Sequence, residues 1–202
     1  MQTDEASGGS GDMSKRLVFS TISDENYRAR AFKHWTSVDK DYKTALTYTK
    51  FDIDREEELE GLSNYFFNTR ETNNIQNFLT FYRFFKGQKK HEYDYYFLID
   101  SNILFPTYFL RDYFKYVEKK KIDISSPVHE ARHQQKFKFK SLVQNVTDTS
   151  FDTDICDGRA ICLSKKAVKK LDSITRKRFK FDKKTFNDLS FLAINFTPIK
   201  YL

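Results

Sequence analysis

The sequence predicts an α/β protein with a mostly parallel central sheet flanked by helices. Residues 93–99 are aromatic or aliphatic except for Asp94 and show no helical spacing, which is typical of a fully buried strand. Strand-like and helix-like patterns alternate along the chain, as they do where helical crossovers join parallel strands. At 202 residues the chain can bury one full core. We therefore expect one domain over residues 14–202, preceded by a disordered, linker-like extension over residues 1–13.

The first half of the chain predicts three strands, each followed by a helix. Ser23, Asp24 and Glu25 favour a helix start directly after the first strand. Gly87 can take the positive φ that ends a helix, so it marks the end of the third helix. The predicted strands cover residues 16–22, 43–49 and 64–68, and the predicted helices cover residues 26–38, 55–62 and 74–86.

The second half continues this alternation. Residues 96–99 are expected in a central strand, because both faces of that strand are apolar. Residues 129–151 are polar and β-branched, which predicts a hairpin or an irregular excursion. Further strands are predicted at residues 122–128 and 158–164, and further helices at residues 106–119, 165–171 and 185–195.

Asp100, Ser101 and Asn102 follow the buried strand directly. Open α/β sheets place their ligand crevice at the carboxyl ends of strands. Residues two apart on an extended chain point to one face, so Asp100 and Asn102 could offer two oxygen ligands to a hard cation on a diphosphate. The alternative is a helix N-cap, since all three residue types cap well and Pro106 suits the start of a helix.

Composition narrows the class of protein. Charged residues make up 31% of the chain and no apolar run approaches the ~20 residues of a membrane span. The polar, acidic N-terminus lacks the apolar stretch of a signal peptide. Cys156 and Cys162 lie six apart, which suits neither a zinc site nor a redox pair. We expect free thiols in a reducing compartment and a cytoplasmic protein.

The net charge of +7 admits more than one partner. A basic face can attract nucleic acid or an anionic membrane surface, and it also suits a substrate that carries a diphosphate. Nucleic-acid binding is the minor interpretation, because no known motif for it accompanies the basic clusters and the clusters form no single stripe. They lie at residues 119–121, 136–140, 165–166, 169–170 and 176–178.

Three landmarks in this order resemble the nucleotide-sugar glycosyltransferases of the GT-A fold. The turn Asp100-Ser101-Asn102 stands where that family has Asp-X-Asp, residues 157–168 are similar to its acceptor-side segment, and residues 186–192 resemble its Glu-Asp helix start. Residues 124–128 and 132–135 are also similar to a little-characterised group of plant and bacterial proteins classed with glycosyltransferases. The resemblance covers about residues 15–196.

The resemblance implies transfer of a sugar, expected to be UDP-linked, from a nucleoside diphosphate sugar to a glycan or other hydroxyl acceptor. Asp188 would be the base of an inverting reaction, although it could instead cap the last helix. Asp100 and Asn102 would hold Mn²⁺ or Mg²⁺. Because the family has an acid at position 102, the amide there leaves metal dependence open. The residues implied to bind the nucleotide and its diphosphate are Thr21, Ser23, Asp24, Asp52, Arg70, Asp100 and Ser101.

Two other functions remain open at this point. A protein with this fold could bind nucleotide sugars without transferring them, because its Asp-Ser-Asn motif departs from the family pattern. A basic α/β domain could instead bind nucleic acid. The first alternative predicts binding without turnover, and the second predicts salt-sensitive retention of DNA or RNA.

Overall fold

The computed structural model of the protein describes residues 15–36, 40–127, 151–153, 159–177 and 199–201. Within these residues eight strands form one sheet, in the order β3-β2-β1-β4-β7-β5-β8-β6. The strands are β1 (Arg16–Ile22), β2 (Lys43–Tyr48), β3 (Tyr65–Asn68), β4 (Tyr95–Ile99), β5 (Ile124–Ser126), β6 (Phe151–Thr153), β7 (Ala160–Ser164) and β8 (Ile199–Tyr201).

The sheet is mostly parallel, as predicted. β3, β2, β1 and β4 all run in one direction, and β5 and β8 are parallel to each other. β7 is antiparallel to both of its neighbours, β4 and β5, and β6 is antiparallel to β8. The helices are α1 (Asp24–Ala29), α2 (Ile53–Leu62), α3 (Asn74–Phe85), α4 (Thr107–Lys120), α5 (Lys165–Lys177) and the 3₁₀ turns η1 (Ala31–His34) and η2 (Lys89–His91).

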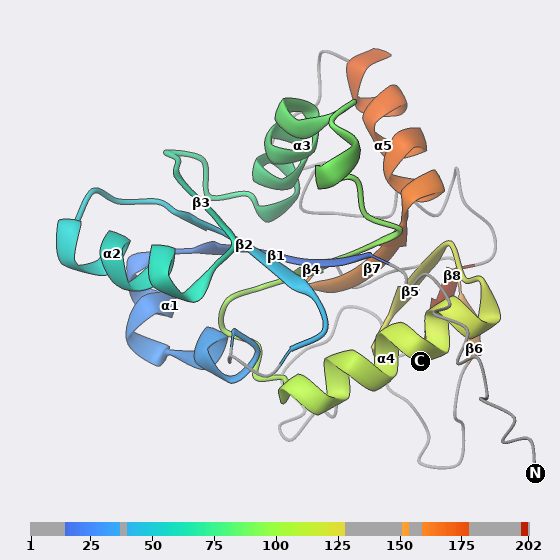
Figure 1. Cartoon of the computed structure of the whole chain (residues 1–202), viewed down its shortest axis with the longest axis horizontal. Helices are drawn as coiled ribbons and strands as arrows, with labels where there is room; N and C mark the ends of the chain where they lie inside the picture. The colour runs from blue at the N-terminus through green and yellow to red at the C-terminus, as the bar shows by residue number, and fades with distance from the viewer. Residues whose placement is uncertain (1–14, 37–39, 128–150, 154–158, 178–198, 202) are drawn as a thin grey trace, which may run out of the picture.

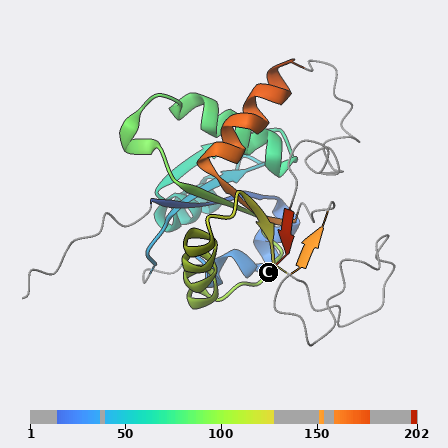
Figure 2. The same ribbon diagram turned by 90° about the vertical axis from the view of Figure 1, so that its right-hand side faces the viewer.

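Helices cover both faces of the sheet. Figure 1 shows α3 and α5 on one side and α4 on the other, and the turned view in Figure 2 keeps these layers apart. Along β1, Leu17 and Phe19 pack with α3 and α5, whereas Val18 and Ile22 pack with α1, α2 and α4. Alternate side chains of a strand point to opposite faces, so β1 contributes to two separate halves of the core.

The central strand is as deeply buried as its sequence predicts. Tyr96, Phe97, Leu98 and Ile99 are all at most 2% exposed. The ring of Phe97 meets that of Tyr113 on α4 edge-on, with 5.1 Å between the ring centroids. Aromatic pairs prefer this geometry, and it stabilises the contact between β4 and α4.

The helix predicted over residues 26–38 is wrong in extent. Ser23 caps α1 as expected, accepting a hydrogen bond from Asn26 N at 3.2 Å, but α1 ends at Ala29. Arg30 takes the left-handed conformation with φ 55°, and the chain continues as η1. This turn lets both Phe32 and Trp35 become fully buried, and their burial outweighs the helical propensity of the segment.

Further differences concern the last strands and the helix α5. β6 and β8 are absent from the prediction, and β5 is shorter than the predicted 122–128. The helix that begins at Lys165 continues to Lys177, beyond the predicted residue 171. The predicted helix 185–195 and nearly all of the predicted excursion 129–151 lie outside the described residues.

A buried carboxylate joins α3 to α5. Asp172 is 1% exposed, and its oxygens accept hydrogen bonds from Arg83 Nε at 2.7 Å, Lys86 Nζ at 2.9 Å and Arg176 Nε at 3.0 Å. Burial raises the pKa of Asp172, but the three cationic donors outweigh it and lower the pKa to about 2. The ionised carboxylate therefore stabilises the folded state.

The pKa of Asp172 predicts a loss of stability in acid. An unfolded Asp has a pKa of about 3.9, so the stabilisation is complete above that pH and is lost as the pH falls toward 2. We expect the free energy of unfolding, measured in urea, to fall between pH 6 and pH 2 by roughly 2 kcal/mol more in the wild type than in Asp172→Asn. Asp112→Asn, at an exposed position on α4, is the control, and its free energy of unfolding should fall as much as that of the wild type. Equal losses in the wild type and Asp172→Asn would contradict the assignment.

Candidate functional site

The carboxyl ends of β1 and β4 form a switch point in the sheet. From β1 the chain crosses to β2 and β3 on one side, while β4 pairs with β1 on the other side. Open α/β sheets bind their ligands outside the carboxyl ends of the strands at such a point, because the connecting loops part there. Ser23, Asp52 and Asp100 all follow the carboxyl ends of strands at this edge.

The three residues after β4 form a tight turn. Ile103 N donates to Asp100 O at 3.0 Å and closes the turn, while Asp100 N donates to Arg159 O beside β7 at 2.7 Å. The side chain of Asp100 is half-buried and that of Asn102 is exposed. The turn thus holds a carboxylate and an amide at the mouth of the switch point.

Ser101 has a different place from the two residues beside it. It is fully buried, and its Oγ donates to Thr21 O at 2.9 Å and accepts from Asn26 Nδ2 at 2.8 Å. These bonds tie the turn to β1 and to α1. Because no surface of Ser101 is exposed, it acts in this structure by holding Asp100 and Asn102 in position.

A network of amide side chains surrounds Thr21. Thr21 N donates to Asn74 Oδ1 at 2.8 Å, and Thr21 Oγ1 accepts from Asn77 Nδ2 at 3.0 Å and from Thr47 Oγ1 at 3.1 Å. Asn74 also donates to Ile99 O at 3.2 Å. The start of α3 is therefore bonded to the ends of both β1 and β4.

Asn74 and Asn77 are functional candidates that the sequence analysis missed. Asn77 is 2% exposed and lies on the otherwise apolar inner face of α3. A polar residue on an apolar helix face requires a buried partner, and this was the available signal. Asn68, at the end of β3, also presents a buried Oδ1 for which the described residues provide no partner.

Asp24 and Asp52 belong to a charged cluster beyond the carboxyl ends of β1 and β2. Asp24 forms ion pairs with Arg55 and with Lys50, the latter at 3.0 Å. Asp52 caps α2 by accepting from Arg55 N at 3.3 Å, and its other oxygen pairs with Arg55 Nε at 3.1 Å. Arg55 also lies over the ring of Tyr27, with its Cζ 4.9 Å from the ring centroid. Arg55 therefore fixes both carboxylates, and the side chain of Asp52 keeps 37% of its surface exposed.

Two predicted site residues, Arg70 and Asp188, and the two cysteines remain. Arg70 is exposed in the loop that follows β3, at the same edge of the sheet. Asp188 lies outside the described residues, as does Cys156, while Cys162 is a buried free thiol in β7. The structure thus brings Thr21, Ser101 and Asp100 together and joins Asp24 to Asp52, but it does not describe the predicted base.

The described residues contain neither a metal-ligand cluster nor a membrane-spanning helix, and some of the basic side chains on α5 have acidic partners. No three His, Cys, Asp or Glu side chains of the described residues gather as a metal site, and no described helix is long and apolar enough to cross a membrane. Lys165 and Lys166 are paired with Glu92 and Asp123, both at 2.6 Å. Part of the positive charge on α5 is therefore neutralised by neighbouring acids.

The chain was compared with known proteins. No family profile matches it, and no curated protein does. Among solved structures, S. aureus TarS matches with a TM-score of 0.59 at 8% identity, over 93% of this chain and 35% of TarS. TarS 1–349 in complex with UDP-GlcNAc matches with a TM-score of 0.60 at 12% identity, over 93% of this chain and 56% of that one. TarS 1–349 in complex with UDP matches with a TM-score of 0.57 at 13% identity, over 93% of this chain and 57% of that one.

These matches show a shared fold. The chain spans little more than half the length of TarS 1–349 and about a third of the longer TarS chain. At 8–13% identity the likeness extends to the fold alone, and it agrees with the α/β class predicted from the sequence. The roles of individual residues must come from the geometry of the site.

Proposed function

We propose that this protein is a glycosyltransferase of the GT-A fold. It would bind a nucleoside diphosphate sugar at the carboxyl ends of β1 and β4 and transfer the sugar to a hydroxyl of a glycan or similar acceptor. The turn Asp100–Asn102 at the switch point is the observation that carries the proposal. Support comes from the fold that the chain shares with TarS, whose structures contain UDP-GlcNAc and UDP.

The diphosphate would lie against the turn after β4. Departure of a nucleoside diphosphate requires stabilisation of negative charge, by a cation or by Lys and Arg side chains. Mg²⁺ in such sites is commonly held by one or two carboxylates together with substrate phosphates. Asp100 would supply one carboxylate, and the amide oxygen of Asn102 would be a further ligand. A bound ion would neutralise charge on the leaving group. Arg70, exposed at the same edge, could supply further positive charge.

Other residues would position the donor or its binding turn. Ser101 and Thr21 are occupied by bonds to each other and to neighbouring side chains, so they would act through the turn. Ser23 holds the start of α1 beside them. Asp52, with its partly exposed carboxylate, could accept a hydrogen bond from the N–H of a uracil, and Asp24 would hold Arg55 beside it.

Donor binding should raise the thermal stability of the protein. At UDP-GlcNAc concentrations about 100 times Kd, we expect a stabilisation of about 2.7 kcal/mol and a rise in Tm of roughly 5–10 °C. The rise should be larger with Mn²⁺ or Mg²⁺ if the turn holds an ion. The measurement is a melting series with UDP-GlcNAc, UDP and GDP, with and without each ion.

The outcomes separate the three functions. A rise in Tm together with release of UDP in the presence of hydroxyl acceptors supports the transferase. A rise without turnover under any condition indicates a binding module that has lost activity. If no nucleotide sugar changes Tm and DNA or RNA is retained in a salt-sensitive manner, the protein is a nucleic-acid-binding domain and the proposal is wrong.

A further inference from the structure

A cavity lies at the amino ends of the strands, away from the proposed donor site. Its volume is about 710 Å³, and Arg16, Lys43 and Tyr65, the first residues of β1, β2 and β3, contribute to its lining. The donor site lies at the opposite ends of these strands. β1 has seven residues at about 3.3 Å each, so roughly 20 Å of strand separates the two edges.

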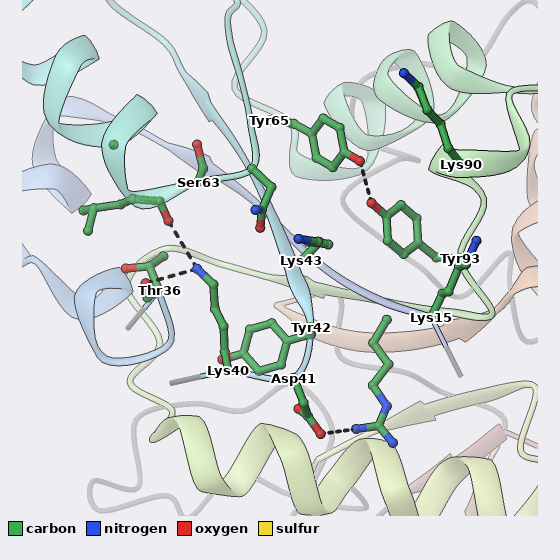
Figure 3. A pocket seen from close by; sticks show the side chains of 14 residues that line it. Lys15, Thr36, Lys40, Asp41, Tyr42, Lys43, Ser63, Tyr65, Lys90 and Tyr93 are labelled. Atoms are coloured by element: carbon green, nitrogen blue, oxygen red, sulfur yellow. Dashed lines mark hydrogen bonds and ion pairs between the residues drawn. The ribbon is translucent and has the colours of Figure 1, made fainter. Parts of the chain in front are cut away.

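The cavity is lined by an excess of positive charge. Lys15, Lys40, Lys43 and Lys90 line it together with Arg16, and Figure 3 shows the labelled lysines around one space. Asp41 is the one carboxylate among the described lining residues. Arg16 pairs with Asp41 and also binds Glu118 through two hydrogen bonds of 2.6 Å. The acid in the cavity is therefore neutralised, and the positive charge of the lysines remains.

Lys40 carries a charge that the described residues do not balance. Its ammonium group is half-buried and donates to Thr36 O at 3.2 Å, Thr44 Oγ1 at 3.1 Å and Leu62 O at 3.4 Å. All three acceptors are neutral. Burial lowers the pKa of Lys40, and the neighbouring charge of Lys43 lowers it further. An anion in the cavity would favour the charged form of both lysines.

Aromatic and polar residues give the cavity a fixed wall. Tyr42 OH donates to Trp35 O at 2.7 Å, and the hydroxyl groups of Tyr65 and Tyr93 lie 2.6 Å apart. Tyr42 and Tyr93 are each 4% exposed, so their rings are held by the core. Side chains fixed in this way lose little conformational entropy when a ligand binds.

We propose that this cavity binds a small anion carrying two or more phosphate or carboxylate groups. Ligand pockets commonly measure about 300–1,000 Å³, and this cavity lies within that range. Lys43 and Lys90 are exposed at the cavity and can move to meet the ligand, while Lys40 is held at its wall. The site is separate from the donor site and takes a ligand of its own.

Pyrophosphate and citrate are suitable probes, because one carries phosphate groups and the other carboxylates. We expect titration at pH 7 to shift the amide NMR signals of residues 40–43, 64–65 and 93. Binding of both probes would indicate selection for charge, and binding of pyrophosphate alone would indicate selection for phosphate groups. Shifts confined to residues 100–102 would place the anion at the other edge of the sheet and overturn the proposal, as would no shifts at all.

Charge-matched variants test the lysines. The double variant Lys43→Gln with Lys90→Gln should bind the probe about tenfold more weakly, since charge-assisted hydrogen bonds are lost. Lys115→Gln with Lys169→Gln removes the same charge at exposed positions outside the cavity lining and should bind as the wild type does. Equal weakening in both double variants would show a general charge effect and overturn the site. Failure of UDP-GlcNAc binding would leave these outcomes unchanged.

Discussion

Asp100→Ala should lower the rate of sugar transfer by about 10³-fold, because it would remove the carboxylate proposed to hold the cation that neutralises the leaving diphosphate, and loss of that cation costs several kcal/mol in the transition state. The fold should survive the change. Both backbone bonds of Asp100, to Arg159 O and from Ile103 N, remain in the variant. Ser101, which ties the turn to β1, also remains in place. The measurement is the rate of UDP release from UDP-GlcNAc in the presence of acceptor.

Two further variants separate charge from shape. Asp100→Asn keeps the size of the side chain and removes its charge, so it should lose nearly as much activity as Asp100→Ala. Asn102→Asp adds a carboxylate at an exposed turn position and should strengthen the dependence of donor binding on Mn²⁺. Melting temperatures near that of the wild type would show that the fold is intact. Unchanged turnover in Asp100→Ala would remove this turn from the proposed site.

The parts of the fold that were predicted correctly depend on short stretches of sequence. The apolar run 96–99 identified β4, and Ser23 identified the start of α1. Gly87 has a φ of 89°, as expected of a residue that closes a helix. Each of these signals comes from neighbouring residues, so it can be read before the chain is folded.

The parts that were missed depend on residues far apart in the sequence. β6 and β8 are three residues each and pair with each other across more than 40 residues, so neither has a periodic pattern to detect. Arg30 ends α1 without being glycine or proline, and the turn places Phe32 and Trp35 in a core cluster with residues of the distant β4 and α4. In both cases tertiary contacts override local propensity.

The sequence predicted which strand end carries Asp100 and Asn102, but not the contacts that hold the turn there. Asp100 and Asn102 were expected at a strand end, and they are found there. The role of Ser101 depends on Thr21 and Asn26, which are 80 and 75 residues away in the sequence. No spacing rule connects these positions, so only the fold shows that Ser101 ties the turn to β1 and α1.

Asp188→Asn should lower the rate of transfer by ~10²-fold or more, the usual scale for loss of a general base. The prediction comes from the resemblance of residues 186–192 to the helix start of GT-A glycosyltransferases. An amide is nearly the same size as a carboxylate and caps a helix equally well, but it cannot accept the proton of the acceptor hydroxyl. Donor affinity and Tm should therefore stay close to those of the wild type.

Asp182→Asn, six residues earlier in the sequence, is the matched control for charge. It should transfer sugar at the wild-type rate if Asp188 alone takes the proton. The pH dependence of the rate should also show the role of Asp188, because loss of a general base removes the acidic limb of the profile. If Asp188→Asn transfers sugar at the wild-type rate, Asp188 does not take the proton, and the base of the proposed reaction must be another residue.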